Sequence, residues 1–237
     1  MTVRKLTAVF RLDHETEPPC FKAWKARYGH FNESQLCKRL CSPVLTPRDF
    51  KCYYRVLTRS LRMRGHDRTA PSQLCRLCGW ARERLTHLPE CSQVLLTFRP
   101  LRVLAFELTG IEARLDARFI YLGLNEEGFL KGSLSDLHII LWKFVMIAFV
   151  KVDVDGAKFK PSLVWKQALS RWRDRMTFQS EELRRSLLKL KSRGGGPPPN
   201  GLIEKYQRRL NPCAYVNEHG AVSYSDAVIR VLTELNL

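Results

Sequence analysis

The sequence has few acidic residues and lacks the carboxylate patterns on which many enzymes depend. Its 237 residues include 23 aspartates and glutamates against 40 lysines and arginines. No two aspartates are adjacent, although a polymerase site needs paired carboxylates to hold its two metal ions. Zinc-protease, phosphate-loop and serine-hydrolase motifs are missing as well. We therefore expect this chain not to be an enzyme.

Long apolar runs are also missing. The longest, from Leu137 to Val150, has fourteen residues and is interrupted by Lys143. A membrane-spanning helix needs about 20 apolar residues, so this run predicts a buried helix. Residues 1–10 hold only a broken apolar stretch that acidic residues soon follow, which is not the pattern of a secretory signal. Basic and apolar residues at helical spacing there leave a mitochondrial presequence open.

Positive charge and cysteine are what the sequence has instead. The net charge is +17 at pH 7, which favours an anionic partner. Nucleic acid is the first candidate and an acidic membrane surface the second. We expect RNA or DNA, bound with low sequence specificity, and no membrane. Eight cysteines without a secretory signal indicate a reducing compartment, so we expect the nucleus or the cytoplasm.

Four candidate metal ligands lie close together in the sequence. Cys75 and Cys78 are separated by two residues, and His87 and Cys91 by three. Zinc prefers four thiolate and imidazole ligands at tetrahedral corners. Gly79 suits the tight turn that lets both sulfurs of the first pair reach one ion, and the second pair fits one helical turn. The protein fills all four positions, so we predict one Zn²⁺ ion with a structural role. The alternative is that these thiols are simply small buried side chains.

A second metal site stays open at this stage. Cys37 and Cys41 are four residues apart, as neighbours on one helix face are. Cys20, Cys52 and His66 are the candidates to complete such a ligand set. The alternative is that the thiols are buried on the apolar side of the N-terminal helices.

Hydrophobic periodicity predicts a mainly α fold. We expect an irregular helical bundle organised around the Cys3His zinc site, with a short C-terminal β-hairpin and helix. Thr46 should cap one helix with Pro47 in its first turn, and Ser133 or Ser135 should cap the apolar one. The expected helices span residues 21–40, 47–64, 91–110, 133–150 and a basic stretch from 161, with weaker helical character over 114–124 and turns at 125–128 and 152–156.

The expected domain organisation follows from composition. A run of three glycines and three prolines predicts a linker between two parts of the chain. The expected parts are an extended lead-in over 1–20, a zinc-binding helical domain over 21–193, the linker over 194–200, and a hairpin–helix appendage over 201–237.

Basic residues recur along one face of the helix predicted over 47–64. Val56, Leu57 and Leu61 share the opposite side, so the helix is amphipathic. A basic stripe of this kind can follow a phosphate backbone, although a solvated face is the simpler alternative. The residues predicted to bind phosphates on this stripe are Lys51, Arg55, Arg59, Arg62 and Arg64. A second basic patch is predicted from Arg184, Arg185 and Lys189.

Residues 21–175 resemble the zinc-binding region that follows the reverse transcriptase domain in non-LTR retrotransposon polyproteins. That region combines a helix rich in arginine and leucine, a Cys-x2-Cys-Gly turn, an acidic residue, a histidine–cysteine pair and an apolar helix bearing tryptophan. The family often has four residues between the histidine and the last cysteine, whereas this chain has three. The matching segments here are Tyr54–Leu57, Cys75–Gly79, Glu83, His87 with Cys91, and Leu141–Phe144.

The resemblance implies metal binding and an accessory role in gripping template RNA or target DNA, with a reverse transcriptase polyprotein as a further partner. It implies no catalysis by this region. Lys151–Ala157 is similar to the first strand of the ribonuclease H fold, but the basic helices and proline-rich segment that follow argue against that fold. Two other interpretations stay open: a zinc-braced module that docks a protein, and a decayed retroelement fragment without selected function.

Overall fold

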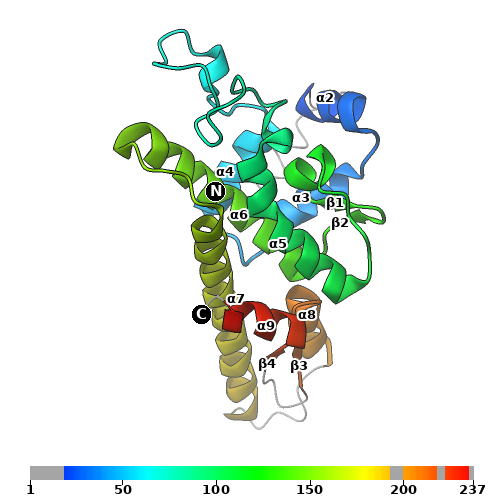
Figure 1. Cartoon of the computed structure of the whole chain (residues 1–237). Coiled ribbons are helices and arrows are strands. Elements are labelled where there is room, and N and C mark those ends of the chain that lie inside the picture. Colours follow the sequence, from blue (N-terminus) through cyan, green and yellow to red (C-terminus); the bar gives the residue numbers. More distant parts are fainter. Residues whose placement is uncertain (1–18, 193–199, 218–221, 235–237) are drawn as a thin grey trace.

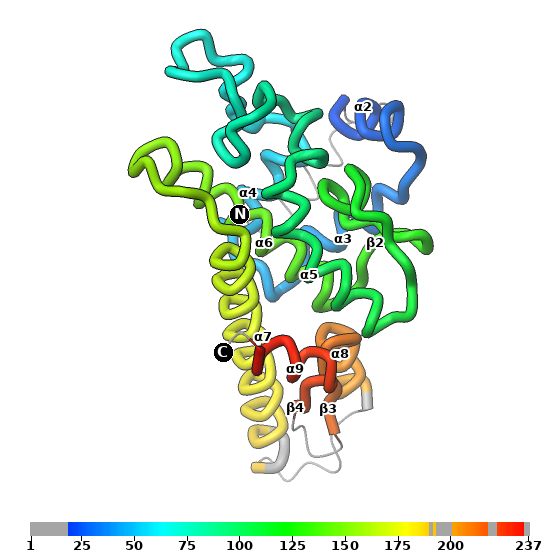
Figure 2. The backbone as a smooth tube through the Cα atoms, in the orientation of Figure 1, coloured from blue at the N-terminus to red at the C-terminus, as the bar shows by residue number. Residues whose placement is uncertain are grey.

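Figure 1 shows the computed structural model, which describes residues 19–192, 200–217 and 222–234. Over these residues the chain is mainly helical, as predicted, with a Cys3His cluster and short antiparallel hairpins. The segment that carries the cluster lies at one end of the molecule, at the top of Figure 1 and Figure 2, and the C-terminal hairpin lies toward the other end. No described helix is both long and apolar enough to cross a membrane.

Two helices replace the single helix predicted near the N-terminal end. Helix α2 spans Pro19–Tyr28 and helix α3 spans Glu33–Leu40. Gly29 between them has φ +84°, a left-handed conformation that favours glycine. The Asn32 side chain then caps α3 by accepting a backbone hydrogen bond at 3.0 Å. The prediction of one continuous helix is therefore wrong at this turn.

Helix α4 begins where the sequence predicts. It spans Pro47–Leu57, and Thr46 caps it in a reciprocal capping box with Asp49. Asp49 also accepts a hydrogen bond at 2.7 Å from Lys143 of the central helix. Burial alone would raise the pKa of Asp49, but hydrogen bonds from Lys143 and Thr46 hold that pKa below its usual range. The start of α4 is thereby tied to the core.

The end of α4 overturns the prediction of one continuous basic stripe. The amides of Arg59 and Ser60 donate to carbonyls one turn back, at 3.1 and 2.9 Å, and Arg59 has φ +57°. This is a Schellman motif, in which the residue after the helix cap is left-handed. Arg59, Arg62 and Arg64 therefore follow the helix instead of belonging to it. The prediction of a helix over 47–64 is wrong for these three residues.

The metal-binding segment lies between α4 and α5. Two short 3-10 helices occur in it, η1 at Arg64–His66 and η2 at Leu88–Glu90. Helix α5 spans Ser92–Thr109 and ends at Gly110, as predicted. Residues 114–124 form only a short π-helix, η3, at 118–122 rather than a longer helix.

A small hairpin then leads into the central helix. Its strands are β1 (Leu124–Asn125) and β2 (Gly128–Phe129), so the turn predicted here is present. Helix α6 spans Gly132–Asp155. The N-cap is Lys131, without a side-chain capping bond, so the prediction of a serine cap is wrong. The helix also includes residues 152–155 of the predicted turn and ends at Gly156, which is left-handed with φ +62°, and the ribonuclease H-like strand does not form.

Helix α6 is the centre of the core. His138 is buried and packed: its Nε2 lies 3.1 and 3.0 Å from the carbonyl oxygens of Phe119 and Ile120. Trp142 donates from Nε1 to the Ile120 carbonyl at 2.7 Å. Arg39 Nη2 lies 3.4 Å from the other ring nitrogen of His138. Side chains of α6 therefore satisfy buried carbonyl groups of the irregular η3 segment.

The remaining elements form the end of the molecule opposite the metal-binding segment. The expected hairpin and final helix are present, and α8, which was not predicted, precedes them. Residues 194–199 of the predicted linker lie outside the described residues. The elements are α7 (Pro161–Ser192), α8 (Asn200–Leu210), β3 (Ala214–Val216), β4 (Val222–Tyr224) and α9 (Asp226–Glu234).

This C-terminal part packs onto α6 and α7. Ser133 of α6 donates to the Leu210 carbonyl at 2.8 Å, and Trp172 of α7 donates to the Ser133 carbonyl at 2.9 Å. The ring of Trp172 lies 6.3 Å from that of Tyr224. The last 37 residues therefore share the core of the body, within the part of them that is described.

Candidate metal centre

The Cys-x2-Cys pair lies in a short hairpin. The Cys75 amide donates to the Ala81 carbonyl at 2.7 Å, and the Glu83 amide donates to the Gln73 carbonyl at 2.9 Å. Between these arms the chain turns at Gly79, whose φ is +74° and whose amide donates to the Cys75 carbonyl at 2.7 Å. A left-handed glycine closes this turn without steric cost. The turn predicted at Gly79 is therefore present.

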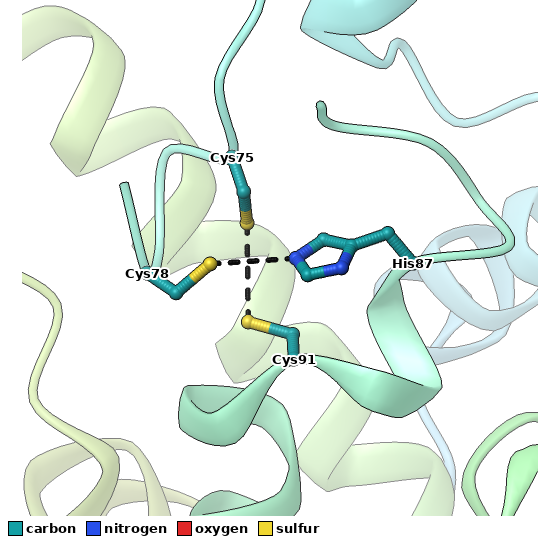
Figure 3. A group of neighbouring side chains, drawn as sticks. All are labelled: Cys75, Cys78, His87 and Cys91. Atoms are coloured by element: carbon teal, nitrogen blue, oxygen red, sulfur yellow. Dashed lines mark hydrogen bonds between the residues drawn. The ribbon is translucent and has the colours of Figure 1, made fainter. Parts of the chain in front are cut away.

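The second pair of ligands comes from the segment that enters α5. His87 immediately precedes η2, and Cys91 follows it as the N-cap residue of α5. The expected helical turn is thus a 3-10 turn, which still keeps the two residues close. Figure 3 shows the side chains of both pairs pointing toward a common centre.

The ligand atoms have the spacing of a tetrahedral metal site. Cys75 Sγ lies 3.8 Å from Cys91 Sγ, and Cys78 Sγ lies 3.3 Å from His87 Nε2. All four ligand atoms lie within 4.8 Å of one another. With metal–sulfur bonds of about 2.3 Å, tetrahedral coordination places two sulfurs about 3.8 Å apart. A disulfide would need about 2.05 Å. The cluster is therefore compatible with one metal ion.

The two buried thiols of the cluster are hydrogen-bonded to each other. Cys75 and Cys91 are at most 1% exposed. The hydrogen bond between their sulfurs raises the pKa of Cys75 and lowers the pKa of Cys91, and the nearby backbone amides at the start of α5 also lower the pKa of Cys91. A cation at the centre of the cluster would be bound by both groups as thiolates, and its binding would release the thiol protons.

A buried ion pair braces the hairpin against α6. Glu83 is 0% exposed and accepts hydrogen bonds from Arg76 Nη2 at 2.6 Å and Nε at 2.8 Å. The Arg64 amide donates to the same carboxylate at 2.8 Å. Both arginine side chains then reach Asp153 near the end of α6, and the Arg76 guanidinium lies 4.9 Å from the ring centroid of Phe149. Burial alone would raise the pKa of Glu83, but these hydrogen bonds hold it below its usual range.

The residues predicted to bind phosphates differ in their surroundings. Lys51 and Arg55 are exposed on α4, and Arg59 is exposed just beyond it. None of these three forms an ion pair with a described carboxylate. Arg62 is exposed but pairs with Asp67 at 2.6 Å, and the half-buried Arg64 pairs with Asp153. Three of the five predicted residues are therefore available to an anionic ligand.

The second predicted patch lies elsewhere on the molecule. Arg184, Arg185 and Lys189 are exposed on the C-terminal half of α7, which runs away from α4 in Figure 1. Arg185 pairs with Glu181 at 3.5 Å, with both side chains mostly exposed. The structure therefore does not bring the two basic patches together.

Several exposed residues of α4 and of the metal-binding hairpin were not singled out from the sequence. Arg48 precedes Lys51 by three residues on the exposed face of α4, a spacing that could have identified it. Arg82 and Arg84 are exposed on the metal-binding hairpin, and neither pairs with a described carboxylate. Trp80, at the turn of the hairpin, is 87% exposed. Tryptophan is usually buried, so the sequence offered no reason to expect that Trp80 is exposed.

A second metal site is not formed by the described residues. Apart from the Cys3His cluster, no described group of three or more histidine, cysteine or carboxylate side chains lies close enough to share an ion. Cys37 and Cys52 are half-buried, and burial raises the pKa of each thiol.

Comparisons with protein-family models, with curated proteins and with solved structures each found no match for this chain.

Proposed function

We propose that the Cys3His cluster holds one Zn²⁺ ion and that this ion has a structural role. Three thiolates and an imidazole suit zinc, whereas magnesium and calcium prefer oxygen ligands. The sulfur–sulfur distance of 3.8 Å fits the tetrahedral geometry of such a site. Protein side chains supply all four ligands, which leaves no open position for a substrate.

We further propose that the protein is a non-catalytic module that binds nucleic acid through its phosphates. One observation carries this proposal: Lys51, Arg55 and Arg59 are exposed without a described carboxylate partner, and so are Arg82 and Arg84 on the hairpin that follows α4 in the chain. An unpaired surface cation can replace the counterions condensed on a phosphate backbone, which makes such binding favourable and sensitive to salt. The net charge of +17 adds long-range attraction.

The metal would fix how these cations are presented. The hairpin joins α4 to α5, and the Arg76–Glu83 ion pair and Asp153 anchor it to α6.

An origin in, or a place within, a retrotransposon polyprotein agrees with the resemblance of the metal motif, and it is part of the proposal. The patch of Arg184, Arg185 and Lys189 would supply a second contact on a longer strand.

A salt titration of oligonucleotide binding tests the proposal. Over roughly 50–200 mM salt, we expect the affinity for RNA or DNA to fall steeply and log-linearly, with weak dependence on sequence. The double variant Lys51→Glu/Arg55→Glu should weaken binding and flatten the salt dependence. A matched double variant, Arg114→Glu/Arg118→Glu, changes charge equally at exposed sites outside both patches and should have less effect. Binding that stayed constant across this range would contradict the proposal and favour a module that docks a protein.

A further inference from the structure

Trp80 differs from every other tryptophan of this chain. It is 87% exposed, whereas the other four are at most 4% exposed. Burial of a large aromatic side chain is ordinarily favourable, so an exposed one forgoes stabilisation of the fold. Packing in the core does not explain why a tryptophan is at position 80. Contact with a ligand is the other role for such a side chain, so its surroundings indicate which ligand would fit.

The hairpin holds Trp80 at a defined position. The residue follows Gly79, whose left-handed turn closes the Cys-x2-Cys loop and has open space around it. It precedes Ala81, whose carbonyl accepts the 2.7 Å hydrogen bond from the Cys75 amide. Its backbone thus lies two residues from the sulfur ligand Cys78 and next to a hydrogen-bonded arm. A residue whose backbone is held before binding loses less conformational freedom when a ligand arrives.

The surface next to Trp80 is basic as well as apolar. Arg82 and Arg84 follow it at alternate positions and are exposed without a described carboxylate partner; Arg82 donates instead to the Gly65 carbonyl at 2.7 Å. Leu74, which pairs with Arg82 across the hairpin, is 46% exposed. The one acidic residue between positions 73 and 87 is Glu83, and it is fully buried. An exposed ring followed at alternate positions by two exposed cations, with no exposed carboxylate between positions 73 and 87, suits a ligand that is both planar and anionic.

We propose that Trp80 stacks on an unpaired nucleic-acid base while Arg82 and Arg84 contact neighbouring phosphates. The inference rests on the proposed nucleic-acid binding and narrows its ligand to single-stranded segments. Within a duplex both faces of each base are already stacked, so the indole ring finds a free base only in a single strand, a loop or an end. Stacking accepts every base, which agrees with binding of low sequence specificity.

The test compares a poly-dT strand with a duplex of the same length, using the full chain loaded with zinc at low salt. The variant Trp80→Ala should bind the single strand about tenfold more weakly and bind the duplex with unchanged affinity. Trp80→Phe keeps an aromatic ring and should retain most of the affinity. The control is Phe106→Ala, which removes another half-exposed aromatic side chain, on α5, and should change neither affinity.

Tryptophan fluorescence gives an independent readout. Because the other four tryptophans are buried, quenching of the emission by the poly-dT strand should come from Trp80 and should disappear in Trp80→Phe. If Trp80→Ala bound the single strand as tightly as the wild type, the stacking inference would be overturned while phosphate binding stood; a tryptophan that docks a protein would give this result. If the wild type bound no oligonucleotide, the proposed function would fail, and this inference with it.

Discussion

At the scale of single residues, the cysteines of this protein occupy very different environments. Cys75, Cys78 and Cys91 converge with His87 on one centre. Cys41 is exposed and belongs to no group of three described ligands, and Cys213 is buried, where burial raises the pKa of its thiol to about 12. The difference between the ligand thiols and the others makes matched substitutions informative.

Replacing Cys78 by serine, or His87 by alanine, is expected to destabilise the protein strongly. Structural zinc contributes roughly 10–16 kcal/mol of apparent binding free energy in finger peptides, which is comparable to the whole stability of a domain. We therefore expect the Tm in circular dichroism to fall by about 10 °C or more. The control Cys41→Ser changes an exposed thiol outside the cluster and should melt like the wild type. Either ligand variant melting at the wild-type temperature would argue against a structural metal.

Asp136 gives the fold a pH dependence of its own. It is 3% exposed, and burial raises its pKa to about 7, although Ser42 and Arg39 oppose this shift. An aspartate in an unfolded chain has a pKa of about 3.9. The folded state therefore binds the proton more tightly, and the stabilisation from this group is complete below about pH 3.9 and is lost as the pH rises through about 7.

The variant Asp136→Asn is expected to remove this dependence, because the amide has no proton to lose in this range. Between pH 4 and pH 8, the free energy of unfolding of the variant should rise by about 4 kcal/mol relative to that of the wild type. Urea denaturation of both proteins at these two pH values measures the difference. Parallel pH profiles of the two proteins would contradict a raised pKa at Asp136.

At the scale of the elements, the metal motif and most helices could be predicted, and the ends of some helices could not. The start of α4 was predictable because Thr46 and Pro47 form a recognisable cap. Its end was not, because Arg59 takes the left-handed position where glycine is usual. Three basic residues were consequently assigned to a helix face that ends before them.

Long-range partners were the other part that the sequence could not provide. Ser133 and Ser135 looked like helix caps, yet Ser133 bonds to the Leu210 carbonyl and Ser135 Oγ accepts a 2.5 Å hydrogen bond from Arg39 Nε. The ligand set was predictable because spacing along the chain alone brings its members together. The ion pair between Arg76 and Glu83 is also local, but its extension to Asp153 depends on how α6 packs.

The Glu83→Gln variant tests whether that ion pair braces the hairpin. Both side chains are nearly buried, at 6% and 0% exposure, so the change leaves the Arg76 charge only partly compensated. Breaking a buried pair in this way costs about 3–5 kcal/mol. Glu181→Gln breaks a mostly exposed pair with Arg185 and should cost less than about 0.5 kcal/mol. If chemical denaturation showed the same loss in the free energy of unfolding for Glu83→Gln and Glu181→Gln, the Arg76–Glu83 pair would not brace the hairpin.

At the scale of the whole molecule, the two basic patches lie far apart. Helix α7 has 32 residues, which corresponds to a length of about 48 Å. Its C-terminal half carries Arg184 and Arg185, and it runs away from α4 toward the C-terminal hairpin (Figure 1). One strand of nucleic acid would have to be long to contact both patches at once.

Charge reversal at the two patches is therefore expected to have different effects. Arg184→Glu/Arg185→Glu should weaken the binding of a long single strand and leave that of a short one almost unchanged, because a short strand cannot reach both patches. Lys51→Glu/Arg55→Glu should weaken both. Competition titrations with strands of increasing length measure this. Equal loss for short and long strands in the α7 variant would place its basic residues in the primary binding surface instead.

The central claim is that one zinc ion holds the hairpin that carries Trp80, Arg82 and Arg84, which together with the cations of α4 forms the proposed nucleic-acid-binding surface. Elemental analysis of the purified full-length chain, with protein concentration determined independently, tests it most directly. The account predicts one zinc per chain, retained on gel filtration and lost together with oligonucleotide binding when a strong chelator is added. A fully folded protein that carried no zinc, or that bound oligonucleotide equally well after the metal was removed, would contradict it.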